Sequence, residues 1–218
     1  MKIAILQGSS QKEKNKILFN TVQQAAPNAE VVNFGVFEDE QEELSYVEAS
    51  FLIGLLLNSG AVDFVVTGCS SGQGMMLACN AWPKVCCGYA PTPQDAFLFG
   101  RINGGNAISL PLGLGFGWCG EVNLKYTLEA LFNGEFGCGY PEKDSLRKQR
   151  DTKLLKEISN NNKKSMTCIL KNLDKEFLNK TLSRKNVIEY ILKNGESTYI
   201  FISCSIIPFS FSTFSSVK

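Results

Sequence analysis

The chain has 218 residues, enough for one domain of about 150 residues and an additional element. It carries 22 Lys and Arg against 21 Asp and Glu, and it contains no histidine. The missing imidazole excludes Ser–His and Cys–His nucleophile pairs and histidine metal sites, and the near-zero net charge gives no electrostatic case for a nucleic-acid or membrane partner.

Short apolar runs separated by helical patterns predict a parallel sheet covered by helices on both faces. Ser45, with Glu48 three positions later, is the pattern of a capping box at a helix start. Strands are expected at residues 2–6, 29–37, 62–67, 84–88 and 107–110, and helices at residues 17–25, 46–57, 73–82 and 92–101. We therefore expect an α/β fold, a doubly wound Rossmann-like three-layer sandwich of about five parallel strands with ligands at the carboxyl ends of the strands.

The second half of the chain is more helical and more charged. Helices are expected at residues 121–132 and 143–158, followed by one or two amphipathic helices over residues 165–192. We divide the chain into an α/β domain (1–158), a helical extension (159–196) and an atypical apolar tail (197–218). The tail contains fewer apolar residues than the about 20 that a membrane span needs. The composition changes abruptly where the tail begins, which suggests a reading-frame change near Asn194.

The eight cysteines do not indicate a disulfide framework, because that pattern belongs to short secreted chains. Residues 1–7 hold too short an apolar run for a signal peptide, so a reducing, cytoplasmic location is expected. No Cys-x-x-Cys pair is present, and Cys86 and Cys87 are adjacent, so a zinc knuckle is not expected.

The most informative segment is VVTGCSSGQGMMLACN, residues 65–80, in which a strand passes into a helix through Cys69 and two glycines. Gly72 and Gly74 let backbone N–H groups converge on an anion at the helix start, and a cysteine at the lip of such a turn is placed to react as a thiolate. A thiolate facing an anion hole suits proton abstraction beside a carbonyl group. From these features alone, a glycine turn that packs tightly around a buried Cys69 is an equally weighted alternative.

On these residues the chain resembles the ribose-5-phosphate isomerase B and galactose-6-phosphate isomerase family. The similar segments are MKIAI, VVNFGVF, GCSSGQGMMLACN and RINGGNAISL, and the resemblance spans about residues 1–158. It implies an aldose–ketose isomerase of a phosphorylated pentose or hexose that works through a cis-enediol, without a metal or an organic cofactor. It also implies a homodimer or homotetramer with sites at the dimer interface.

The resemblance implies a role for each matching residue. Cys69 would be the general base, and Ser71 would assist proton transfer between the two sugar oxygens. The implied substrate contacts are Ser9 in the first loop, Ser70, Gly72, Gln73 and Gly74 as backbone donors, Asn103 on a sugar hydroxyl, and Arg101, Arg147 and Arg150 on the phosphate. Without the resemblance, Arg147 and Arg150 are more simply read as part of a solvated helix face.

Two positions depart from the family pattern. Ser9 and Ile102 stand where the family carries histidines, the second of which opens the sugar ring. The departure indicates a linear or differently opened substrate, a replacement acid such as Asp95 or Glu121, or a loss of activity. A non-catalytic sugar-phosphate binding or regulatory protein is therefore the second hypothesis, and a structural oligomer is the third.

Overall fold

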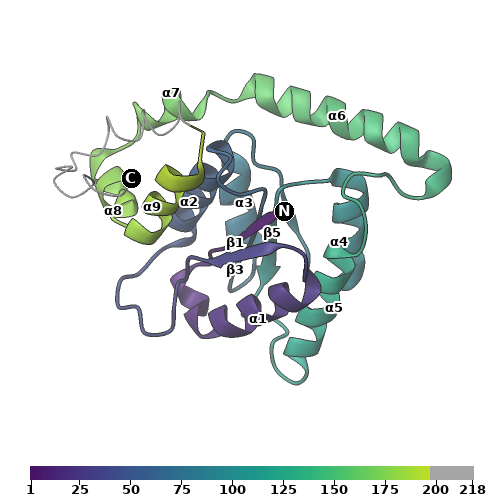
Figure 1. The fold of residues 1–218 in the computed structure, drawn as a ribbon, viewed down its shortest axis with the longest axis horizontal. Coiled ribbons are helices and arrows are strands. Elements are labelled where there is room, and N and C mark those ends of the chain that lie inside the picture. Colours follow the sequence, from purple (N-terminus) through teal and green to yellow (C-terminus); the bar gives the residue numbers. More distant parts are fainter. Residues whose placement is uncertain (197–218) are drawn as a thin grey trace, which may run out of the picture.

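The computed structural model describes residues 1–196, so the expectations for the tail lie outside the described residues. Five parallel strands form one sheet in the order β2-β1-β3-β5-β4 (Figure 1). They are β1 (Lys2–Ile5), β2 (Glu30–Asn33), β3 (Phe64–Cys69), β4 (Cys87–Tyr89) and β5 (Ala107–Pro111). The doubly wound parallel sheet is confirmed, although β2 is shorter than expected because Gly35, with φ of 91°, turns the chain out of the sheet.

Helices cover both faces of the sheet. One face packs against α1 (Asn15–Ala25), α4 (Pro93–Leu98) and α5 (Gly120–Phe132), and the other packs against α2 (Tyr46–Asn58) and α3 (Gln73–Ala81). Successive side chains of a strand point to opposite faces of the sheet, and this alternation divides the core in two. Ile3 and Ile5 of β1 join the core with α1 and α5, whereas Ala4 and Leu6 join the core with α2 and α3.

The predicted capping box begins α2. The Ser45 hydroxyl accepts from the Glu48 N–H at 3.2 Å, and Glu48 Oε2 accepts from the Ser45 N–H at 2.7 Å. Behind this cap, α2 is buried along most of its length, with Phe51, Leu52 and Ile53 fully enclosed. The helix is therefore a fixed element beside the sheet, with its N-terminus held at a defined position.

Several helices differ from the sequence-based expectation in number or length. The segment expected as one helix over residues 92–101 consists of α4 followed by a π-helical turn, η2 (Phe99–Asn103). Three short helices replace the expected one or two at the end: α7 (Met166–Leu170), α8 (Lys175–Leu182) and α9 (Lys185–Asn194). Asp174 causes one of these breaks, because its side chain caps α8 by accepting from the Phe177 N–H at 2.9 Å.

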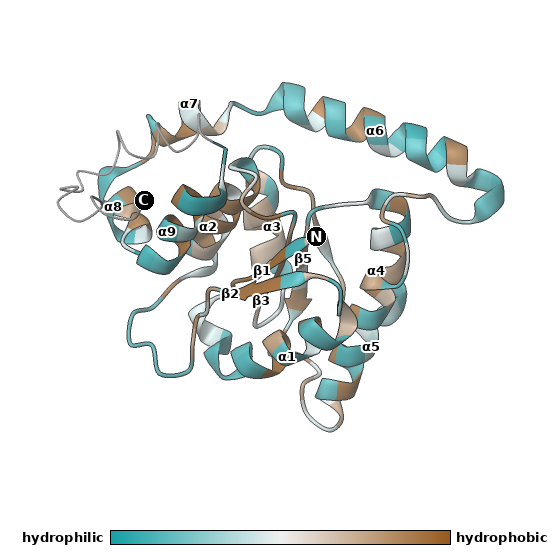
Figure 2. Cartoon of the chain, in the orientation of Figure 1, coloured by the Kyte–Doolittle hydropathy of each residue, from teal (hydrophilic) through white to brown (hydrophobic). Residues whose placement is uncertain are grey.

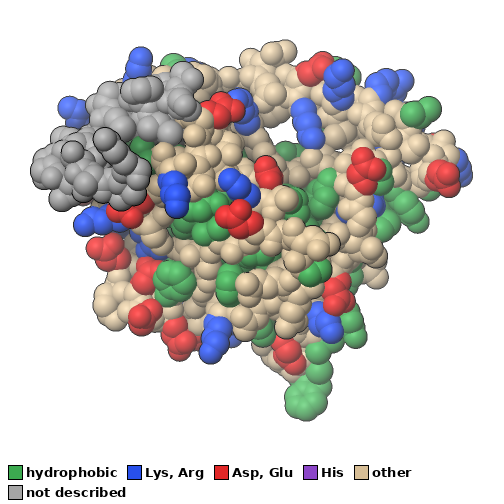
Figure 3. Space-filling view, in the orientation of Figure 1, with side chains coloured by type: hydrophobic (Ala, Val, Ile, Leu, Met, Phe, Trp, Pro, Cys, Tyr) green, Lys and Arg blue, Asp and Glu red, His purple; other side chains and the backbone are tan. Residues whose placement is uncertain are grey.

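A long charged helix, α6 (Ser145–Asn162), follows a short 3-10 turn, η3 (Glu142–Asp144), and contains no buried residue. The proposed division at residue 158 falls within it. Figure 2 shows α6 as mainly hydrophilic with a few hydrophobic residues, and Figure 3 shows an opening between it and the rest of the chain. Within residues 1–196, no helix is both long and apolar enough to cross a membrane.

The helical extension packs against α2 and shares its core. Met166, Leu178, Val187 and Ile191 are buried with the residues of α2, and the Phe51 and Phe177 rings meet edge to face with centroids 5.3 Å apart. The extension is thus a further helical layer on the outside of α2, adjacent to the carboxyl ends of β1 and β2 (Figure 1).

Candidate functional site

The direction in which the chain adds strands to the sheet reverses between β1 and β3. From β1 the chain first adds β2 on one side, and it then adds β3, β5 and β4 on the other side. In doubly wound sheets, ligands bind outside the carboxyl ends of the strands at such a reversal. Cys69 is the last residue of β3, and η1 (Ser9–Lys14) begins directly after β1. The Gly8 N–H donates to the Gly68 carbonyl at 3.2 Å and joins the two segments.

Close backbone packing fixes the direction of the Cys69 turn. A Cβ atom at Gly68 would lie 2.5 Å from the Leu110 carbonyl oxygen, so only glycine fits between β3 and β5. The Leu112 N–H donates to the Cys69 carbonyl at 3.0 Å, and the Gly113 N–H donates to the Ser70 carbonyl at 2.9 Å. The turn is therefore held from β5 and the residues that follow it.

The glycines of the turn expose the N-terminus of α3. Gly72 has φ of 75° and precedes the first helical residue. The first-turn N–H groups, among them that of Gly74, have no carbonyl partner inside the helix and carry the positive end of its dipole. The Tyr46 ring lies beside Gly74, where a Cβ atom would be 3.5 Å away. Gly74 is thus a candidate backbone donor, whereas the Gln73 N–H donates to the Ser71 hydroxyl at 3.4 Å.

Cys69 lines a cavity of about 590 Å³, together with Ser9, Ser10, Lys12 and Tyr46. Its thiol is partly exposed and forms no disulfide. The volume is within the usual range for small-molecule sites. A partly exposed thiol at the end of a strand, next to free helix N–H groups, is an arrangement suited to proton transfer at a carbon beside an oxyanion.

Serines of the two loops approach one another at this cavity. Ser70 Oγ accepts from Gln11 Nε2 at 3.0 Å and lies 3.3 Å from Ser10 Oγ. The Ser9 hydroxyl accepts from the Leu44 N–H and so anchors the chain that leads into α2. The structure thus brings the predicted Ser9 and Ser70 next to Cys69. Ser71 follows on the same turn, where its hydroxyl accepts from the Gln73 N–H at 3.4 Å.

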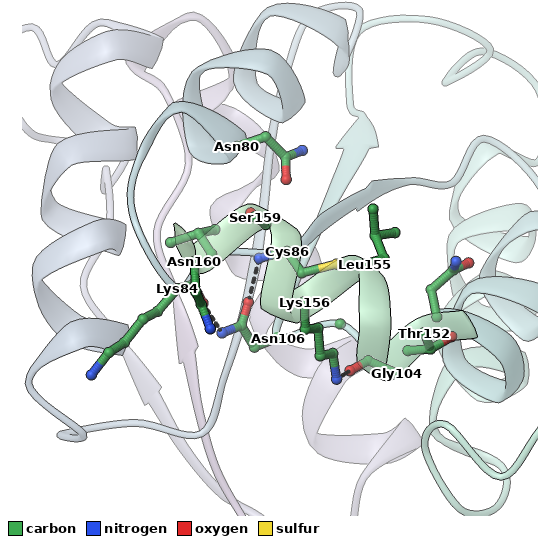
Figure 4. Close-up of a pocket in the computed structure, with 13 residues that line it drawn as sticks. Asn80, Lys84, Cys86, Gly104, Asn106, Thr152, Leu155, Lys156, Ser159 and Asn160 are labelled. Atoms are coloured by element: carbon green, nitrogen blue, oxygen red, sulfur yellow. Dashed lines mark hydrogen bonds between the residues drawn. The ribbon is translucent and has the colours of Figure 1, made fainter. Parts of the chain in front are cut away.

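Of the predicted residues, only Cys69 and Ser9 line the Cys69 cavity, and the predicted residues of the turn that follows Cys69 do not line it: Ser70, Ser71, Gly72, Gln73 and Gly74. Asn103 lines a second cavity of about 330 Å³, which lies beneath α6 at the amino ends of β4 and β5 (Figure 4). Arg147 and Arg150 are exposed on the first turns of α6, where Asp151 lies 3.6 Å from the Arg147 guanidinium and 2.8 Å from that of Arg150. The candidate residues therefore form two groups within one chain.

Arg101 requires a correction. It was expected to meet a phosphate, but its side chain is only 4% exposed, and it donates to the Asn133 and Leu131 carbonyl oxygens at 2.8 Å each. The guanidinium also lies 5.4 Å from the Phe136 ring centroid. Burial lowers the pKa of Arg101, partly offset by the charges of Cys138 and Glu135. Arg101 supports the fold and is not available to a ligand here.

Two asparagines that carry the family resemblance have structural roles. Asn106 accepts from the Cys86 N–H at 2.8 Å and donates to the Lys84 carbonyl at 2.8 Å (Figure 4). Asn80 accepts from the Cys87 N–H at 3.0 Å and donates to the Cys87 carbonyl at 2.8 Å. Together they replace the strand partners that the short β4 lacks at its start.

The charged wall of the Cys69 cavity was not predicted from the sequence. Glu48 and Lys180 line it, and their side chains form an ion pair of 2.6 Å between α2 and α8. Burial opposes ionisation of Glu48, but hydrogen bonds from Lys180 and Ser45 outweigh it, so the pKa of Glu48 is below its ordinary value. The capping box marked Glu48 in the sequence, whereas no local pattern marked Lys180.

Within residues 1–196, no three His, Cys, Asp or Glu side chains gather in a way that would hold a metal ion.

The family model described as Ribose/Galactose Isomerase matches residues 3–143 of the chain. No curated protein matches it.

Solved structures of isomerases match nearly the whole chain. A 4-deoxy-L-threo-5-hexosulose-uronate ketol-isomerase, solved with a tartrate, is 42% identical over 94% of this chain and 99% of its own, with a TM-score of 0.89. A ribose-5-phosphate isomerase from Vibrio parahaemolyticus is 35% identical over 95% of this chain and 99% of its own, also with a TM-score of 0.89. A type B ribose 5-phosphate isomerase from Trypanosoma brucei, 17% identical over 70% of this chain and 97% of its own, has a TM-score of 0.58 and shares the fold.

Proposed function

The chain belongs to the ribose/galactose isomerase family, and on that premise we propose that it is an aldose–ketose isomerase in which Cys69 moves the proton. The observation that carries the proposal is the position of Cys69 at the reversal of the sheet, in one cavity with Ser9 and on the turn that leads into the N-terminus of α3. This is where a doubly wound sheet binds its ligand.

The proposed reaction needs only groups of this chain. The Cys69 thiolate takes the proton from C2 of the aldose, and the electron pair forms the C1–C2 double bond while charge moves to O1. Backbone N–H groups of the α3 N-terminus stabilise the resulting enediolate. The Ser71 hydroxyl relays the O2 proton to O1, and the Cys69 thiol returns its proton to C1 to complete the ketose.

The substrate class follows from the missing imidazole. Ribose 5-phosphate and galactose 6-phosphate close rings through a C4 or C5 hydroxyl, and the family opens such rings with a histidine at the position of Ile102. The compound named for the 42% identical relative is deoxygenated at C4 and carries a keto group at C5, so it cannot close a five- or six-membered ring on C1. A chain without histidine is therefore best suited to an open-chain uronate of this kind, with a phosphorylated pentose or hexose as the second candidate.

The two groups of candidate residues support a homodimer as the working form. In one chain, Asn103, Arg147 and Arg150 are outside the Cys69 cavity. The α6 helix that carries the arginines has no buried residue, and Leu146, Leu154, Leu155 and Ile158 are exposed on it. We propose that a second copy covers α6 and brings its Asn103 to the Cys69 cavity, so that each site is shared between two chains.

The test compares purified protein with its Cys69→Ala and Cys69→Ser variants. The open-chain uronate, ribose 5-phosphate and galactose 6-phosphate are each supplied in deuterated water, and conversion and deuterium at the exchanged carbon are followed by NMR. We expect turnover of the uronate with deuterium incorporation, and loss of both in the two variants.

A matched control is Cys168→Ala, which removes a partly exposed thiol of α7 outside the cavity. It should keep full activity. Binding of a sugar without exchange in the unmodified protein would instead favour a non-catalytic binding protein, and unchanged turnover in Cys69→Ala would remove Cys69 from the mechanism.

A further inference from the structure

The Cys69 cavity has an unusual charged wall. It is formed by Lys12 of η1, Glu48 of α2, Lys180 of α8 and the second part (40–43) of the acidic loop, which we define as residues 38–43. Four glutamates, Glu40, Glu42, Glu43 and Glu48, line the cavity against two lysines. An anionic substrate would be repelled here unless the buried carboxylates are neutralised by other groups.

The two least exposed glutamates are neutralised within the protein. The Glu40 carboxylate accepts from both terminal nitrogens of Arg184 and, at 2.8 Å, from the Phe37 N–H. The Glu48 carboxylate accepts from Lys180 and from the Ser45 N–H. Glu42 and Glu43 are exposed on the acidic loop, where solvent screens them.

Lys12 differs from these groups because it has no carboxylate partner within residues 1–196. Its ammonium donates to the backbone carbonyl of Glu40 at 3.0 Å. An ammonium has three N–H donors, so two remain. Lys12 therefore presents a positive charge and two donors to the cavity that holds Cys69.

We infer that Lys12 binds the anionic end of the substrate, and that the C-terminal extension positions it. This inference rests on the proposed function. It assigns the anion to Lys12 of the same chain as Cys69 and not to the arginines of α6. A lysine binds a carboxylate or a phosphate as a point charge, so Lys12 suits the anionic end of a uronate or of a sugar phosphate.

The extension reaches Lys12 through the acidic loop. Arg184, which is 9% exposed, precedes α9 and holds the Glu40 carboxylate. It also donates to the Phe34 carbonyl at 2.9 Å, beside the end of β2. Since the Glu40 carbonyl holds Lys12, fixing Glu40 also fixes the lysine. Arg184 is a positioning residue, and Lys12 is the residue that contacts substrate.

The test measures binding without turnover. Calorimetry is performed on Cys69→Ala protein with the open-chain uronate and, separately, with ribose 5-phosphate. Adding Lys12→Gln should weaken binding of the preferred ligand about 10- to 100-fold, as expected for loss of a charge-assisted hydrogen bond. Adding Lys16→Gln, an exposed lysine of the adjoining α1, should leave the affinity unchanged.

Arg184→Gln tests positioning. It should weaken binding less than Lys12→Gln, and the double variant should bind no more weakly than Lys12→Gln alone, because Arg184 acts through Lys12. Glu40→Gln provides the same test if Arg184→Gln fails to fold. In protein with intact Cys69, Lys12→Gln should raise KM much more than it lowers kcat.

Two results would overturn the inference in distinguishable ways. Unchanged affinity in Lys12→Gln, with a loss in an Arg147→Gln and Arg150→Gln variant, would assign the anion to α6 and leave the proposed isomerase intact. Absence of binding and of turnover for both ligands in every form would remove the proposed function and this inference together.

Discussion

The hydroxyl of Ser109 donates a hydrogen bond of 2.7 Å to the carbonyl oxygen of Gly72 and so connects the centre of β5 to the turn that carries Cys69. Both groups are shielded from water, and the same carbonyl accepts from the Met76 N–H at 3.1 Å in the first turn of α3. The turn that leads into α3 is thus held by a side chain from the neighbouring strand.

Ser109→Ala should lower the free energy of unfolding by about 1 kcal/mol, the usual net value of one buried hydrogen bond. It should lower kcat by more than it raises KM, because in the proposed reaction the α3 N-terminus stabilises mainly the charged intermediate. Urea unfolding and steady-state kinetics measure both. Thr127→Val is the control, because the buried Thr127 hydroxyl has no partner in the described part of the chain; an equal loss of activity there would contradict the prediction.

Gly72→Ala should be more damaging. A side chain at φ of 75° is strained by about 1–2 kcal/mol, and the added Cβ would lie 2.7 Å from the Tyr89 ring and 2.9 Å from the Leu110 carbonyl carbon. We expect a loss of stability of at least that size, measured by thermal or urea unfolding. Gly117→Ala is the matched control, since a Cβ there meets nothing within 4 Å. Equal stability of the two variants would show that the turn relaxes freely.

The Glu48–Lys180 pair should make stability depend on pH. The folded-state pKa of Glu48 is below its ordinary value of 4.5, so the contribution of the pair is present above pH 4.5 and is lost as pH falls through the lower folded value. Lys180→Gln should therefore destabilise the protein at neutral pH, and it should destabilise it less at an acidic pH low enough to protonate Glu48 in the folded state as well. Urea unfolding at the two pH values tests this, and an equal effect at both would exclude the ion pair as the cause.

Local patterns predicted the parts of the fold and site that are local in sequence. The apolar runs gave the strands, and Ser45 with Glu48 gave the start of α2. The two glycines after β3 predicted the strand-to-helix turn into α3. Each of these depends on residues a few positions apart, where spacing alone determines the geometry.

The rest depends on contacts between distant segments. Lys12, Glu40 and Arg184 are separated by 28 and 144 positions, and nothing in their surroundings marks which charges will pair. The family resemblance suggested Arg101 as a phosphate contact, whereas here carbonyl groups at the C-terminal end of α5 and just beyond it satisfy its side chain in the interior. The separation of Asn103 from Cys69 is likewise set by the order of the strands, because the two residues lie at opposite ends of neighbouring strands β5 and β3.

Asn103 and Asn106 should respond differently to alanine substitution. Asn106→Ala leaves the Cys86 N–H and the Lys84 carbonyl without their partner and should cost about 1–3 kcal/mol of stability. Asn103→Ala should change stability by less than about 0.5 kcal/mol, as for other positions without structural bonds, and should lower activity if Asn103 contacts substrate. Unfolding and kinetics of both variants decide this. A stability loss in Asn103→Ala as large as that in Asn106→Ala would make Asn103 structural.

The shared site predicts complementation between two inactive variants. Cys69→Ala removes the base from one group of residues, and Asn103→Ala removes a substrate contact from the other. If each site takes Cys69 from one chain and Asn103 from its partner, random pairing of the two variants restores one intact site in half of the dimers. That is about a quarter of all sites, since pairing follows the symmetry of a two-fold dimer. Mixing the variants after mild dissociation should therefore recover about a quarter of the original activity.

The control mixes Cys69→Ala with Cys69→Ser, which share the defect and should stay inactive. Recovery no greater than the sum of the separate variants would place all catalytic groups of a site in one chain, and the exposed α6 would then need another explanation.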